Sequence, residues 1–219
     1  MSSDAPDLAA LRAAVADFAK YTGADRPWEV LVAATAPGLD LAVAEHRVSM
    51  LRWLNSWGCR IRYPRQGEPD VFDVNLARWW DTWRDALPDL TTSIADLSEA
   101  TIAGLGDCYA ELAAMPAAHA ARPRSLGPTA AAKLLYALRP LGVMPWDEMI
   151  ARHLHGARDS AAYAAHQRLG RDWARALLAE AGTDEHGLSV LLGRPGRPLA
   201  KMLDEYCYIA FTRDAGRTA

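Results

Sequence analysis

Lysine and cysteine are scarce in this chain of 219 residues, and long apolar runs are absent. Three lysines stand against 21 arginines, and the three cysteines lie far apart, at Cys59, Cys108 and Cys207. Cysteines at such spacing suggest no zinc knuckle, iron–sulfur loop or disulfide framework. No apolar stretch approaches the roughly 20 residues of a membrane span, and the acidic, polar start at residues 1–7 is not typical of a secretory leader. The sequence therefore predicts a cytoplasmic protein that does not enter a membrane.

Several motifs of common enzymes are also missing. The chain has no glycine-rich phosphate loop followed by Lys-Ser/Thr, no dinucleotide fingerprint, no His-Glu-x-x-His and no Gly-x-Ser-x-Gly. His153 and His155 are two residues apart, so on a helix they point in different directions, and a metal site built from them would need irregular backbone. His46 and His166 lie in amphipathic segments, where histidines are more often hydrogen-bonded at the edge of the core than bound to metal. We therefore expect neither a cofactor nor a metal.

Charge is distributed unevenly along the chain. The formal net charge is −3, but residues 1–116 carry 10 Lys+Arg against 17 Asp+Glu, whereas residues 117–219 carry 14 against 10. We therefore expect an anionic partner to meet the C-terminal half. A simpler interpretation is that the two halves neutralise each other across a shared interface.

Helical periodicity dominates the sequence, and strand alternation is nearly absent. Alanine, with 43 residues, favours helix because it loses no side-chain entropy there. We predict an all-α, two-lobed globule of roughly nine or ten helices. An Ala/Pro/Arg connector at 117–125 separates an N-terminal lobe, 1–116, from a C-terminal lobe, 117–219, although one continuous domain fits the same pattern. The expected helices lie near residues 6–18, 27–36, 40–57, 73–87, 98–115, 128–139, 147–155, 160–181, 184–192 and 198–212.

Three tryptophans, Trp79, Trp80 and Trp83, lie close together in the expected helix 73–87. Aromatic faces stack on any nucleobase, so these side chains could form a base-stacking or small-ligand surface. Trp79 and Trp83 are four residues apart on the apolar face of that helix, however, which favours packing in the core.

A turn rich in glycine, proline and arginine spans residues 193–198 and leads directly into a helix. Helix N-termini attract anions, and Arg194, Arg197 and Lys201 would reinforce that attraction. The turn therefore predicts either a contact with DNA phosphate or a solvated capping turn, and the sequence does not decide between them.

The most distinctive stretch spans residues 126–150. A Gly127-Pro128 turn opens a short helix with Lys133 in its middle, and a connection between two prolines then leads to Asp147 at the start of the next helix. Lys133 stands among alanines and leucines, and a buried amine loses solvation and becomes more nucleophilic. A carboxylate at a helix N-terminus stays ionised. This pair of groups therefore suits attack on an electrophilic carbon.

This order of a hairpin glycine, a helix, a short link and an aspartate that opens the next helix resembles the helix-hairpin-helix DNA glycosylases, especially the branch that excises 8-oxoguanine. In that family the aspartate follows the hairpin glycine by about twenty residues, and Gly127 and Asp147 are 20 residues apart. The likeness covers about 30 residues. The chain departs from the family pattern in its single hairpin glycine, and in placing Lys133 about one helical turn later than the family lysine, which would fall near Thr129 or Ala130.

The resemblance implies two α-helical lobes with a base-accepting cleft between them, and excision of an oxidised purine from double-stranded DNA, with strand cleavage as a further activity. Lys133 would attack the sugar carbon and form a Schiff base. Asp147 would stabilise the positive charge that develops on the sugar or relay a proton, and Trp146 would line the base pocket. The groups expected to hold backbone phosphates are Arg122, Arg124 and the turn from Gly127 to Thr129.

A purely structural interpretation of the same stretch also exists. Aspartate is a common helix N-cap, which alone explains Asp147. Lys133 could extend to the surface or pair with a carboxylate of the N-terminal lobe, and Trp146 could be a hydrophobic staple. The alternative function is then a non-enzymatic helical module for interaction or regulation.

Overall fold

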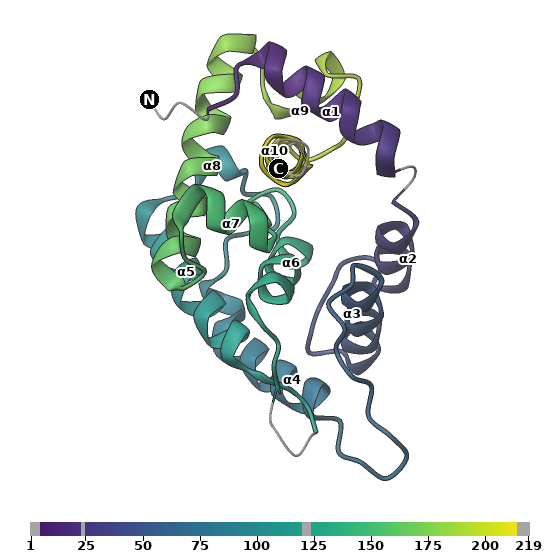
Figure 1. The fold of residues 1–219 in the computed structure, drawn as a ribbon. Helices are drawn as coiled ribbons and strands as arrows, with labels where there is room; N and C mark the ends of the chain where they lie inside the picture. Colours follow the sequence, from purple (N-terminus) through teal and green to yellow (C-terminus); the bar gives the residue numbers. More distant parts are fainter. Residues whose placement is uncertain (1–4, 23–24, 120–123, 214–219) are drawn as a thin grey trace.

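The computed structural model describes residues 5–22, 25–119 and 124–213. These residues form ten α-helices and one small two-stranded sheet, which confirms the all-α prediction (Figure 1). In chain order the helices are α1 (Leu8–Thr22), α2 (Arg26–Ala34), α3 (Ala44–Ser56), α4 (Val71–Trp83), α5 (Glu99–Ala114), α6 (Pro128–Leu138), α7 (Glu148–His155), α8 (Ser160–Ala181), α9 (Glu185–Leu191) and α10 (Leu199–Cys207). The shorter elements are the 3-10 helices η1 (Arg84–Ala86) and η2 (Ile94–Asp96), the π-helix η3 (Tyr208–Arg213), and the strands β1 (Pro116–Ala118) and β2 (Arg124–Ser125).

Polar caps and glycines fix where many of these helices begin and end. The side chains of Asp25, Asp70 and Asp159 accept hydrogen bonds from first-turn N–H groups of α2, α4 and α8. Gly156 and Gly182 end α7 and α8 in the left-handed conformation. Local sequence therefore sets the helix bounds, and most of the predicted ranges lie close to those observed.

Two segments differ from the prediction. α3 begins at Ala44 rather than near Asp40, because Asp40 accepts hydrogen bonds from Ala42 N at 2.9 Å and from Trp80 Nε1 at 3.0 Å. These bonds hold the chain before α3 in a turn against α4. The predicted connector at 117–125 contains β1 and β2, which pair antiparallel.

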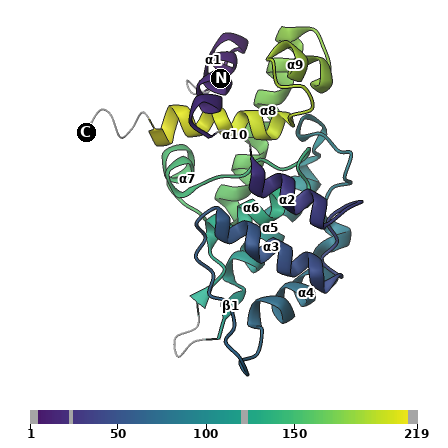
Figure 2. The ribbon, with the colours of Figure 1, turned by 90° about the vertical axis from the view of Figure 1, so that its right-hand side faces the viewer.

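A single large hydrophobic cluster runs through both predicted lobes. α5 and α8 pack along each other near its centre, and α1 lies across α10 although the two helices are at opposite ends of the chain (Figures 1 and 2). The division of the chain at residues 116 and 117 stays a prediction. Helices α1 and α10, one from each predicted lobe, pack against each other and so connect the two lobes through the core. None of the helices in the described part of the chain has the length and apolar character that a membrane crossing needs.

The packing of α5 on α8 depends on a close approach at Gly106. A Cβ atom at this position would lie 3.0 Å from the carbonyl oxygen of Ser160 and 3.2 Å from the Cβ of Ala164. At Gly104, on the same helix, a Cβ would meet no such neighbour within 4 Å. An alanine at position 106 would therefore require the two helices to move apart by a few tenths of an ångström.

These two glycines form a matched pair for a stability test. We expect Gly106→Ala to lower the free energy of unfolding by about 1 kcal/mol through overpacking. We expect Gly104→Ala to raise it by about 0.5–1 kcal/mol, because alanine favours helix without a clash. Urea unfolding of both variants checks this, and a Gly106→Ala protein as stable as Gly104→Ala would contradict the close packing.

Candidate functional site

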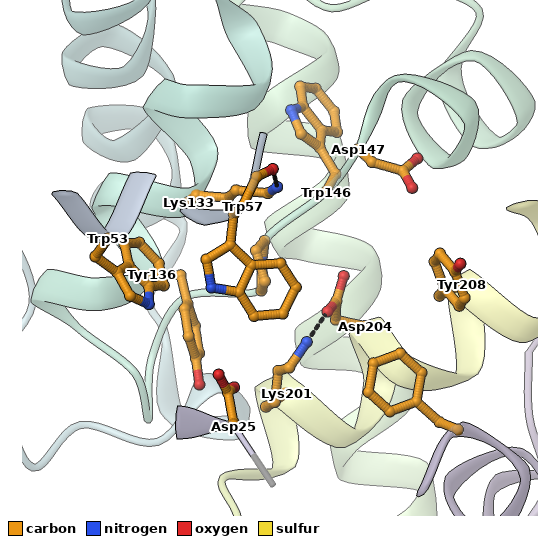
Figure 3. A pocket seen from close by; sticks show the side chains of 12 residues that line it. Asp25, Trp53, Trp57, Lys133, Tyr136, Trp146, Asp147, Lys201, Asp204 and Tyr208 are labelled. Carbon is orange, nitrogen blue, oxygen red and sulfur yellow. Dashed lines mark hydrogen bonds and ion pairs between the residues drawn. The ribbon is translucent and has the colours of Figure 1, made fainter. Parts of the chain in front are cut away.

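A cavity of about 310 Å³ opens where α1, α3, α6, the link before α7, and α10 meet (Figure 3). Its aromatic walls come from segments far apart in the sequence: Phe18, Trp53, Trp57, Tyr136, Trp146 and Tyr208. Its charged walls are Asp25, Lys133, Asp147, Lys201 and Asp204. Two of the three lysines of the chain, and both predicted catalytic residues, thus line one cavity.

Lys133 lies on α6 and reaches across to the end of α3. Its Nζ donates a hydrogen bond to the carbonyl oxygen of Trp57 at 3.2 Å and lies 5.2 Å from the centroid of the Trp57 ring. Trp57 caps the C-terminus of α3, where a cation is stabilised by the helix dipole. The side chain is half-buried, whereas the apolar sequence around it predicted burial.

Asp147 is the N-cap of α7 and also faces the cavity. Its Oδ1 accepts a hydrogen bond from Ile150 N at 2.8 Å, and its Oδ2 accepts one from Thr212 Oγ1 at 3.2 Å. The same carboxylate therefore caps α7 and lines the cavity, so the structural and the functional interpretation of Asp147 are compatible.

Trp146 is almost completely buried, with 1% of its surface exposed. Its ring packs against Tyr109, Tyr163, His155 and His166, with centroid distances from 5.1 to 5.8 Å. Trp146, which the sequence predicts to line the base pocket, therefore contributes an edge to the cavity. It also anchors the link before α7 in the core.

Lys201 lies in the cavity wall, although the sequence suggested it as a phosphate contact. It forms an ion pair with Asp204, and its side chain is 8% exposed. Its Nζ is 5.2 Å from the centroid of the Phe18 ring and 5.6 Å from that of Trp57. Lys201 is thus a buried cation held among aromatic rings and a carboxylate.

The turn at 193–198 lies beside the cavity and shares Asp25 and Tyr136 with it. Arg197 hydrogen-bonds Glu205, which is fully buried on α10, and Arg194 Nη2 lies 3.7 Å from Glu205 Oε1. Burial raises the pKa of Glu205 in spite of these arginines. The guanidinium of Arg197 therefore already has an anionic partner within the protein.

The other predicted phosphate contacts lie at the start of α6 and before it. Gly127 has φ +85°, and its N–H donates to the carbonyl of Ala113 at 3.0 Å. Because Pro128 has no N–H, a phosphate at this turn would rely on Thr129. Arg124 is exposed in β2, and Arg122 lies outside the described residues.

The sequence did not single out Trp53, Trp57, Tyr136 or Asp204 as site residues. No local motif distinguishes these residues in the sequence. Trp79 and Trp80, which do form a visible cluster in the sequence, are buried in the core, where their indole N–H groups donate to the Cys108 carbonyl and to Asp40. Packing is therefore confirmed for Trp79 and Trp80, Trp83 is half-buried against the same core, and a different set of aromatic residues lines the cavity.

No family model, curated protein or solved structure matches the chain. Over the residues that the structure describes, no group of three or more His, Cys, Asp or Glu side chains lies close enough to hold a metal ion. The chemistry of the site therefore has to be argued from its own side chains.

A buried histidine, His166, and a half-buried one, His155, support the link that carries Trp146 and Asp147. His166 Nε2 donates to the carbonyl of Pro145 at 3.2 Å, and its Nδ1 lies 3.2 Å from Nε2 of His155. Burial, followed by the neighbouring His155, lowers the pKa of His166 from 6.5 to about 3. Burial also lowers the pKa of His155.

This depressed pKa predicts a loss of stability in mild acid. The unfolded chain takes up the proton below pH 6.5 while the folded His166 stays neutral, so stability is complete above pH 6.5 and falls as the pH drops toward 3. Between pH 6.5 and pH 5 we expect a loss of about 1.5 kcal/mol from this residue.

Urea unfolding at several pH values measures the effect. His166→Gln keeps a donor for Pro145 and should flatten the pH dependence, whereas His153→Gln, at an exposed histidine, should leave it unchanged. An equal pH dependence in both variants would contradict the burial of a neutral His166.

Proposed function

We propose that this protein binds damaged duplex DNA and excises an oxidised purine, with Lys133 as the nucleophile and Asp147 as its charged partner. The observation that carries the proposal is the meeting of the Lys133 amine, the Asp147 carboxylate and several aromatic rings at one cavity (Figure 3). An amine and a carboxylate on separate elements are the groups that attack at a sugar carbon requires.

The size and walls of the cavity suit a single flipped base. Its volume of about 310 Å³ lies at the lower end of the range for small-molecule sites. The rings of Trp57, Tyr136 and Tyr208 offer aromatic surface, and enzymes that act on bases read the flipped base by stacking and by hydrogen bonds. Carboxylates and ammonium groups around these rings supply acceptors and donors for such bonds.

An exposed basic end offers contacts for the DNA backbone. Arg60 and Arg65 are exposed in the irregular segment after α3, and Arg124 is exposed in β2. Arg62 Nη1 donates to the carbonyl of His119 at 2.6 Å, which joins this segment to the hairpin at the lower end of Figure 1. Phosphate binding at this end would be independent of sequence and sensitive to salt.

In the proposed reaction, the unprotonated Nζ of Lys133 forms a bond to C1′ of the flipped nucleotide. The C1′–N9 bond breaks, and its electron pair leaves with the purine, which takes up a proton. The lysine nitrogen then loses a proton and its lone pair forms a double bond to C1′, while the C1′–O4′ pair goes to O4′, which is protonated. The product is a protonated Schiff base, and loss of a C2′ proton from it would expel the 3′ phosphate and break the strand.

Asp147 contributes through its charge. As the base departs, C1′ and O4′ gain positive charge, and a fixed carboxylate at the edge of the cavity lowers the free energy of that state. The hydrogen bonds from Ile150 and Thr212 hold this carboxylate in place before the substrate arrives.

Borohydride trapping on a duplex that contains 8-oxoguanine tests the nucleophile. Hydride reduces the Schiff base to a stable secondary amine, so the wild-type chain should become covalently attached to the DNA. Lys133→Gln should abolish the adduct, and Lys20→Gln, at an exposed lysine on α1, should not. If the wild-type chain gives no adduct and no salt-dependent retention on DNA, the non-enzymatic helical module is the better account.

A second variant separates the charge of Asp147 from its capping role. Asparagine is as good an N-cap as aspartate, so Asp147→Asn should change the free energy of unfolding by less than about 0.5 kcal/mol. It should slow single-turnover excision at least about 100-fold, because the stabilising charge is lost. Unchanged excision by a stable Asp147→Asn protein would show that the carboxylate serves the helix alone.

A further inference from the structure

The cavity contains a second lysine whose surroundings differ from those of Lys133. Lys201 forms an ion pair with Asp204, and the exposed fractions of the two side chains are 8% and 14%. Its Nζ also lies near the faces of Phe18 and Trp57. A carboxylate partner and aromatic faces both stabilise the charged ammonium form. Lys201 is therefore held in the cavity wall as one half of an ion pair.

Lys133 is held by a neutral group instead. Within the described residues its Nζ forms a hydrogen bond to the Trp57 carbonyl and no ion pair. A carbonyl oxygen accepts a hydrogen bond from a neutral amine as well as from an ammonium. The contact to Trp57 is therefore compatible with the neutral amine that attack on a carbon requires.

Both amines point toward the same space. Their Nζ atoms lie 5.2 and 5.6 Å from the centroid of the Trp57 ring, Lys133 on the side of α6 and Lys201 on the side of α10 (Figure 3). The second carboxylate oxygen of Asp204 also points into the cavity in this view. A ring bound beside Trp57 would thus lie in the neighbourhood of both amines.

We infer that Lys201 is a further catalytic residue, which protonates the departing purine while Asp204 maintains its charge. This inference rests on the proposed excision reaction and assigns the proton that the reaction needs. When the C1′–N9 bond breaks, an N–H bond of the Lys201 ammonium breaks as well, and the proton joins the electron pair on the purine. Lys201, now neutral, takes up the proton that the alkylated nitrogen of Lys133 releases, through solvent, and is ready for the next cycle.

The two lysines then act at different steps, and two substrates separate them. A duplex with 8-oxoguanine requires departure of the base and formation of the Schiff base. A duplex with an abasic site already presents the sugar aldehyde, so its trapping by borohydride needs the Lys133 amine but no leaving-group proton. Single-turnover release of the base is measured on the first duplex, and trapping on the second.

We expect Lys201→Met, which keeps the length of the aliphatic stem, to slow release of 8-oxoguanine at least about 100-fold. The same variant should be trapped on the abasic duplex at the wild-type rate. Lys133→Gln should fail on both duplexes, and Lys20→Met should behave as wild type on both. Asp204→Asn, which removes the charged partner of Lys201, should also slow release of the base and leave trapping on the abasic duplex at the wild-type rate.

Each outcome has a definite meaning. If Lys201→Met slows release and trapping equally, Lys201 only shapes the cavity, and the inference is wrong. If it slows neither, the leaving-group proton comes from elsewhere, and the inference is also wrong. If the wild-type chain is inactive on both duplexes, the proposed function fails first, and the role of Lys201 fails with it.

Discussion

The attachment of the backbone of one residue, Met144, to a buried glutamine holds the wall of the cavity that carries Asp147 in place. Gln167, on α8, accepts a hydrogen bond from Met144 N at 2.9 Å and donates one to Met144 O at 2.8 Å. The glutamine is fully buried, so loss of either bond would leave a polar group without water. This pair fixes the chain three residues before Asp147. His166, the neighbour of Gln167, adds a bond to Pro145, and together the two residues hold the link between α6 and α7 against α8.

Once the link between α6 and α7 is fixed, the packing of the neighbouring helices places the other walls of the cavity. Trp146 is enclosed by aromatic rings of α5 and α8, so the next residue emerges at the edge of the core and begins α7. α10 then passes across the opening with Lys201 and Asp204 facing inward. Placing ions where solvent is partly excluded costs stability unless they are paired.

The positions of the helices and the site residues of segment 126–150 could be predicted from the sequence, because both depend on neighbours along the chain. Caps such as Asp25 and Asp159 and the periodic apolar faces are local signals. Lys133 stood out because a lysine among alanines and leucines is locally unusual, and Asp147 because it opens a predicted helix 20 residues after Gly127. Trp57 and Asp204 carry no such mark, since they join the site only through the packing of α3 and α10 against α6. Lys201 was noticed for its basic surroundings, but its direction into the cavity depends on how α10 lies across the core.

The central claim is that the Lys133 amine attacks a sugar carbon inside this cavity. Peptide mapping of the borohydride-reduced adduct tests it most directly, because mass spectrometry identifies the lysine that carries the sugar remnant. The account predicts the remnant on Lys133, with Lys201 and Lys20 unmodified. A remnant on Lys201, or on any residue outside the cavity, would contradict it.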